Sequence, residues 1–131
     1  MMNKDDQRTT RIHLMEALYQ YDIYQEQSLD FTPNLTDEDH LKVYHQMVER
    51  ISEIDQIIEK HLYNYRLNRL SFVDRAIIRL AVFELLEKVV PGPIVIDEAI
   101  ELTKIYTNLD DEKQHKFNNK LLDAIYQSLK D

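Results

Sequence analysis

The chain has 131 residues, of which 44% are apolar and 31% charged, with a net charge of −8. This length is enough for one ordinary domain with a single core. The sequence contains one glycine, Gly92, and three prolines. That excludes the dinucleotide-binding fingerprint, the P-loop and the lipase nucleophile elbow, each of which needs at least two glycines. A sandwich or barrel with many turns is also disfavoured, so the composition predicts an all-helical protein.

Cysteine is absent, which excludes disulfides, a thiolate nucleophile, a zinc ribbon and an iron–sulfur cluster. The first residues contain no apolar stretch that could serve as a signal peptide. The longest run without a charged residue, 89–96, has eight residues and includes two prolines, whereas a membrane helix needs about 20 apolar residues. We therefore expect a cytoplasmic chain that does not span a membrane.

The negative net charge argues against a general nucleic-acid-binding protein, but the charge is unevenly distributed. Residues 30–65 contain eight acidic and three basic side chains, whereas residues 66–90 contain five basic and three acidic ones. A nucleic-acid site would therefore be local, or shared with a more basic partner.

Apolar residues at helical spacing predict a series of helices separated by polar or proline-containing segments. The expected helices cover residues 11 to about 27, 36 to 61–65, 71 to the stop at 90–93, about 96 to 106, and 111 onward. The second is long for a globular helix, and we expect a kink near Ser52. A polar, flexible arm of residues 1–8 is expected before the first helix. The pattern predicts one all-α domain over residues 1–131, a compact bundle of about six or seven helices.

Residues that can cap a helix stand at several of these starts. The expected caps are, in chain order, Thr9 or Thr10, Thr36 with Asp39, Ser71 with Asp74, and Asp111. The helix that begins after Ser71 is apolar on more than one face, which is typical of the buried centre of a bundle. We therefore expect Ile77, Leu80 and Ala81 in the core.

Pairs of histidine and carboxylate residues raise the question of a metal site. Three pairs have the i, i+3 spacing found in the di-iron sites of helical bundles: Glu112 with His115, Asp37 with His40, and His13 with Glu16. The first two pairs lie in the first turns of predicted helices, where acidic residues are favoured by the helix dipole. We interpret all three as polar surface features and predict no metal or other cofactor. No nucleophile–base pair stands out, so no enzymatic activity is predicted.

Four segments of the sequence are informative when their residues, order and spacing are taken together. They are residues 16–20 (E-A-L-Y-Q), 69–85 (R-L-S-F-V-D-R-A-I-I-R-L-A-V-F-E-L), 96–104 (I-D-E-A-I-E-L-T-K) and 115–123 (H-K-F-N-N-K-L-L-D). In order and spacing, they resemble the NusB family of bacterial transcription antitermination factors. The resemblance covers essentially the whole chain. It implies an all-helical fold of two small sub-bundles and a function without enzymatic chemistry.

The resemblance also implies partners. Family members bind a boxA-type single-stranded RNA together with the small-subunit ribosomal protein that doubles as factor NusE, within the transcription elongation complex that makes ribosomal RNA. The matching partner-binding residues here are Tyr19 and Asp74. The matching RNA-binding residues are Arg8, Arg11, Lys113, Gln114, Lys116, Phe117 and Lys120. An exposed aromatic ring can stack on an unpaired base while nearby cations meet phosphates.

Two departures from the family pattern bear on RNA affinity. The arm, which usually has consecutive arginines, is Q-R-T-T-R over residues 7–11, and the family's V-N-G is N-N-K over residues 118–120. The alternative function is therefore a helical protein-interaction module on the same scaffold, with little or no RNA binding. The RNA-binding domain that is fused to some RNA methyltransferases is disfavoured, because no glycine-rich cofactor domain follows. The eight tyrosines fit either the edge of the core or a binding face.

Overall fold

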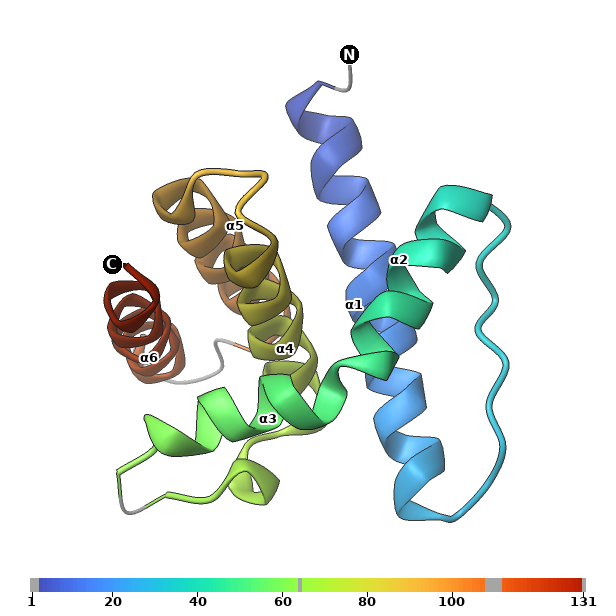
Figure 1. Ribbon diagram of the computed structural model, residues 1–131, viewed down its shortest axis with the longest axis horizontal. Helices are drawn as coiled ribbons and strands as arrows, with labels where there is room; N and C mark the ends of the chain where they lie inside the picture. Colours follow the sequence, from blue (N-terminus) through green and yellow to red (C-terminus); the bar gives the residue numbers. More distant parts are fainter. Residues whose placement is uncertain (1–2, 64, 108–111, 131) are drawn as a thin grey trace.

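The computed structural model describes residues 3–63, 65–107 and 112–130. Over these residues it contains six α-helices, one 3-10 helix and no β-strand: α1 (Lys4–Glu26), α2 (Glu38–Glu49), α3 (Ile51–Lys60), η1 (Leu67–Arg69), α4 (Phe72–Glu87), α5 (Gly92–Tyr106) and α6 (Lys113–Leu129). The helix α4 lies between α1 and α2 on one side and α5 and α6 on the other (Figure 1). This confirms the predicted all-α bundle. None of the described helices is long and apolar enough to cross a membrane.

The helix α1 begins seven residues earlier than predicted. Its N-cap is Asn3, whose side chain accepts a hydrogen bond from the backbone N–H of Asp6 at 2.8 Å. The expected caps Thr9 and Thr10 lie inside the helix, and the Thr10 hydroxyl donates to the backbone carbonyl of Asp6 at 3.0 Å. The prediction that an arm precedes the helix is therefore wrong for residues 4–8, which form the first turns of α1.

The long second helix of the prediction is two helices with a corner at Arg50. The N-cap of α2 is Asp37, one residue after the expected Thr36, and its carboxylate accepts from two backbone N–H groups at 2.8 and 3.2 Å. The break at Arg50 comes two residues before the expected kink. The Arg50 guanidinium donates to Glu53 at 2.8 Å and to Glu87 at 3.2 Å, which ties the corner to the end of α4.

The central helix α4 forms as predicted. The Ser71 hydroxyl accepts a hydrogen bond from the backbone N–H of Asp74 at 3.0 Å, which is the expected cap. Its side chains are buried on every face because α1, α3, α5 and α6 all pack against it. The predicted core residues Ile77, Leu80 and Ala81 are all buried. The apolar pattern on more than one face therefore identified the centre of the bundle.

The helix α5 begins at Gly92, four residues before the predicted start. Pro91 and Pro93 stand at the N-cap and within the first turn, where a missing N–H costs nothing. Gly92 is buried, and a Cβ atom there would overlap the aromatic ring of Tyr126 on α6. The only glycine of the chain therefore allows α5 and α6 to approach closely, rather than merely ending the preceding helix.

The last helix begins at Lys113. The N-cap position is held by Glu112, which has a left-handed backbone (φ 64°) and makes no capping hydrogen bond through its side chain. The expected cap, Asp111, lies outside the described residues. The core-facing side of α6 is formed by Leu121, Leu122 and Ile125.

Candidate functional site

The first turns of α6 present three lysines and an aromatic ring on one face. Lys113, Lys116, Phe117 and Lys120 have the spacing that aligns side chains along one side of a helix, and all four are exposed. We call these four residues the α6 basic face. Lys116 lies 3.7 Å from a carboxylate oxygen of Glu112. Because the positive end of the helix dipole adds to the lysines, this face attracts anions.

Asp74 lies in a buried hydrogen-bond network that joins α4 to the end of α5 and the start of α6. Its side chain accepts from the Thr107 hydroxyl at 2.9 Å, the Asn118 amide at 3.1 Å and the Ser71 hydroxyl at 2.7 Å. The residue is 4% exposed. The Gln114 amide donates to the Asn118 side-chain oxygen at 2.9 Å. The structure therefore places Asp74, expected at the partner surface, and Gln114, expected at the RNA surface, in one network.

Tyr19 on α1 lies against Phe72, the first residue of α4. Its half-buried ring meets the ring of Phe72 edge to face, with centroids 6.4 Å apart. Phe72 precedes Val73 at the start of α4, and Val73 borders a hollow of about 410 Å³ next to Asp74. The hollow is lined by Ser71, Val73, Asp74, Tyr106, Thr107, Lys113 and Gln114. Asp74, one of the two predicted partner residues, and Lys113, the first lysine of the α6 basic face, therefore line the same hollow.

Arg8 and Arg11 are placed differently, in ion pairs that pack α1 against α4 and α5. Arg8 donates to Glu98 at 2.7 Å, and Arg11 donates to both carboxylate oxygens of Glu84 at 2.8 and 2.9 Å. Arg11 is 7% exposed. Burial acts to lower the pKa of Arg11, but the hydrogen bonds to Glu84 and the attraction of Glu84 and Glu98 outweigh it and raise that pKa. These guanidinium groups are thus occupied by carboxylates within the fold.

The predicted RNA residues consequently fall into two groups at opposite ends of α4. Arg11 is held by Glu84 near the end of that helix, whereas the α6 basic face lies near Asp74 at its start. Ten residues of α-helix separate these two positions, which corresponds to about 15 Å. The structure therefore does not bring Arg8 and Arg11 together with Lys113, Lys116 and Lys120 in one site.

An aromatic patch shares Phe117 with the α6 basic face, and its two tyrosines were not singled out from the sequence. It consists of Tyr63, Tyr65 and Phe117, which are 83%, 40% and 36% exposed. The rings of Tyr65 and Phe117 are in contact, with centroids 5.5 Å apart. The signal for this patch was the segment Y-N-Y-R-L-N-R over residues 63–69, in which two tyrosines are followed by two arginines.

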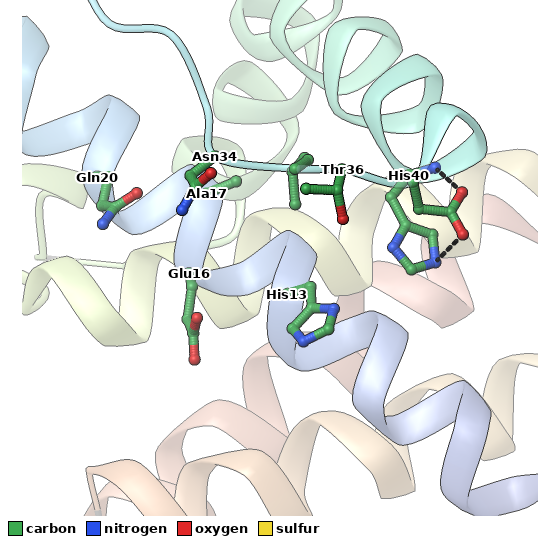
Figure 2. Close-up of a pocket in the computed structure, with 9 residues that line it drawn as sticks. His13, Glu16, Ala17, Gln20, Asn34, Thr36 and His40 are labelled. Carbon is green, nitrogen blue, oxygen red and sulfur yellow. Dashed lines mark hydrogen bonds and ion pairs between the residues drawn. The ribbon is translucent and has the colours of Figure 1, made fainter.

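A polar hollow brings together two of the histidine–carboxylate pairs (Figure 2). His13 and Glu16 on α1 line this hollow together with the start of α2, where His40 lies 3.8 Å from the Asp37 carboxylate. The two imidazole rings are 6.0 Å apart. Within the part of the chain that the structure describes, no three histidine or carboxylate side chains are arranged to hold a metal ion.

Known proteins resemble this chain in both sequence and fold. Residues 8–127 match the NusB family. The transcription antitermination protein NusB of Myxococcus xanthus is 35% identical in an alignment 136 residues long. The alignment covers 93% of this chain and 95% of that protein. A crystal form of T. maritima NusB superposes with a TM-score of 0.72 at 35% identity, covering 92% of this chain and 89% of that one.

A further solved structure is described as the antitermination factors NusB and NusE in complex with dsRNA. It superposes with a TM-score of 0.69 at 30% identity, covering 93% of this chain and 96% of that chain. The fold thus defines a class of small helical proteins, some of which have been seen with RNA and a protein partner. This chain belongs to the NusB family.

Proposed function

We propose that this chain is a transcription antitermination adaptor without catalytic chemistry of its own, acting in the cytoplasm. It binds a boxA-type single-stranded RNA together with a NusE-type ribosomal protein and joins the transcription elongation complex. The observation that carries this proposal is the α6 basic face, an exposed aromatic ring between lysines, which adjoins the hollow at Asp74. Phosphates meet the lysines while a base stacks on Phe117.

The electrostatics favour RNA binding by the chain together with its ribosomal protein over RNA binding by the chain alone. If Lys113, Lys116 and Lys120 each neutralise one phosphate, the slope of log affinity against log salt is only about −2 for a single strand. The net charge of −8 repels RNA at long range. A basic ribosomal protein bound near Tyr19 and the hollow at Asp74 makes the local electrostatic potential positive and adds phosphate contacts of its own. We therefore expect weak RNA binding by the chain alone.

The test is the affinity of a boxA-type RNA for the chain alone, the NusE-type protein alone and the pair. We expect the pair to bind at least tenfold more tightly than either component. Phe117→Ala should weaken the pair by about 1–3 kcal/mol, the usual value of one stacked base. Tyr24→Ala is the matched control, because Tyr24 is 38% exposed and lies away from the α6 basic face, against Phe31.

A second candidate function is a protein-interaction module that no longer binds RNA. It is favoured by the ion pairs of Arg8 and Arg11 with Glu98 and Glu84, because these occupy the two arginines that the family resemblance assigned to RNA. If the pair forms but binds boxA-type RNA no better than the ribosomal protein alone, this second function replaces the first.

A further inference from the structure

A small apolar hollow lies beneath the aromatic patch, between the end of α3 and the middle of α6. Its volume is about 230 Å³, and it is lined by Leu62, Leu121 and Ala124 together with the patch, His61 and Lys120. This is smaller than the clefts of roughly 300–1,000 Å³ that enclose drug-sized ligands. The hollow therefore fits one flat ring system better than it fits a folded peptide.

The rings around this hollow are held from two separate parts of the chain. Tyr65 comes from the segment between α3 and η1, and its hydroxyl donates to the backbone carbonyl of Arg69 at 3.3 Å. Phe117 comes from α6, and the two ring planes meet at 53°. Tyr63, which is 83% exposed, stands at the same hollow. Adjacent exposed aromatic rings of this kind mark an interaction surface.

The basic groups beside the patch form no ion pair with the residues that the structure describes. Five of the seven arginines of the chain, Arg8, Arg11, Arg50, Arg75 and Arg79, are in ion pairs. The other two are Arg66 and Arg69, which border a second hollow beside Tyr65. In the described ranges, no carboxylate oxygen lies within 4.0 Å of the charged nitrogens of Arg66, Arg69 or Lys120.

We infer that this hollow is a binding site for one unstacked nucleobase of a single-stranded RNA, with Tyr65 and Tyr63 as stacking surfaces and Arg66 and Arg69 as phosphate contacts. This inference rests on the proposed function and extends its site from α6 to the segment before η1. The strand leaves the α6 basic face at Phe117 and continues across Tyr65 toward the two arginines. Because every base has a stacking face, this position tolerates any base.

The charge pattern and the size of the hollow favour RNA over a protein segment. An amphipathic helix in a groove needs apolar anchors over two or more turns, and the hollow offers one short apolar floor with cations on its rim. Aromatic rings interleaved with cations are the usual surface for single-stranded nucleic acid. A segment of acidic protein is the competing occupant, and the test separates the two.

The experiment measures boxA-type RNA binding by the chain paired with its ribosomal protein, using single substitutions in the chain. We expect Tyr65→Leu and Tyr63→Leu each to weaken binding by roughly fivefold to a hundredfold, the range for loss of one stacked base. Arg66→Gln and Arg69→Gln should each reduce the salt slope by about 0.7. Tyr24→Leu and Arg50→Gln are matched controls, since Tyr24 is as exposed as Tyr65 and Arg50 is an ion-paired surface arginine. Both controls should bind as the native chain does.

Cross-linking to the native chain reports the RNA contact directly, so it does not depend on whether a substitution destabilises the fold. A short RNA carrying one 5-bromouracil at successive positions should cross-link to Tyr65 or Tyr63 from one or two adjacent positions. If the native pair binds RNA while the tyrosine and arginine variants match their controls, the inference is wrong and the proposed function stands. If the native pair binds no RNA, both are wrong. If the tyrosine variants lose affinity for the ribosomal protein instead of the RNA, the hollow is a protein site and the inference is overturned.

Discussion

The side-chain amide of Asn118 donates a hydrogen bond to the Asp74 carboxylate at 3.1 Å, and this contact joins the start of α4 to the start of α6. Asn118 is fully buried and also donates to the Thr103 hydroxyl at 3.1 Å. The asparagine at this position was a departure from the family pattern that seemed relevant to RNA affinity. In the structure it belongs to the interior, because its amide satisfies two buried oxygen atoms.

Asp74→Asn should lower the free energy of unfolding by about 1–3 kcal/mol, the cost of leaving buried polar groups unsatisfied. The new amide would place donor hydrogens against the Asn118 and Thr107 donors or against Ser71. Urea denaturation measures the loss, and Asp97→Asn, an exposed position on α5, is the control. A loss below half a kcal/mol would mean that the carboxylate acts only at the partner surface.

Arg11→Ala should destabilise the fold by about 3 kcal/mol, because it removes one partner of a largely buried ion pair and leaves the Glu84 carboxylate without this guanidinium. Arg66→Ala, which breaks no ion pair of the described residues, should change stability by less than about 0.5 kcal/mol. Thermal and urea unfolding compare the two variants. Equal effects on stability would contradict the packing role given to Arg11.

Gly92→Ala should destabilise the chain by about 1–3 kcal/mol through overpacking against Tyr126. The double variant Gly92→Ala with Tyr126→Ala provides the control, because removing the ring makes room for the new methyl group. The glycine substitution should then cost much less in the Tyr126→Ala background than in the native chain. Additive losses would show that the close approach of α5 and α6 is not the reason for the glycine.

Burial raises the pKa of Tyr44 to about 12. Since the phenol is neutral in the folded chain but ionises near pH 10 when unfolded, the stability that this group contributes is present below pH 10 and is lost as the pH rises from about 10 to about 12. Urea unfolding at a series of alkaline pH values measures the slope, and Tyr44→Phe should reduce it. Tyr63→Phe, at an exposed site, should leave the slope unchanged.

The backbone N–H groups of His40 and Asp39 hold the pKa of the Asp37 carboxyl below its usual value. A lowered carboxyl pKa stabilises the folded chain above the unfolded value of about 3.9, and this contribution is lost as the pH falls below it. Asp37→Asn keeps the capping oxygen but cannot titrate, so it should flatten the acid limb of the stability profile. Glu38→Gln, one residue away, should not, and an unchanged acid limb in Asp37→Asn would contradict the charged cap.

Most of the fold followed from apolar spacing and caps. The Ser71 cap and the buried centre at Ile77 were predicted because both depend on residues close together in the chain. The start of α1 was missed, because the polar residues before Arg11 carry no apolar pattern, although Asn3 can cap a helix. The start of α5 was missed because its prolines resemble a stop, whereas proline is tolerated in a first turn.

The site was less predictable, since it depends on contacts between distant segments. Nothing near Arg11 in the sequence indicates that Glu84, 73 residues away, binds its guanidinium. Likewise, the contact of Tyr65 with Phe117 joins two segments that only the fold brings together. The family resemblance named the lysines of α6 as RNA-binding residues, and the structure places them on one exposed helix face, which is a local property of their spacing.

The most extensive family likeness of the chain, residues 69–85, coincides almost entirely with α4, and nearly every side chain of α4 is covered by neighbouring helices. A helix without a solvent face accepts few substitutions, because each one must fit several neighbours at once. Its likeness to relatives therefore records how the bundle is packed and carries little information about what the surface binds. Two chains can share this helix and differ widely in RNA affinity. The residues that would set that affinity lie on α6 and before η1, where substitutions on the surface do not disturb the packing of the core.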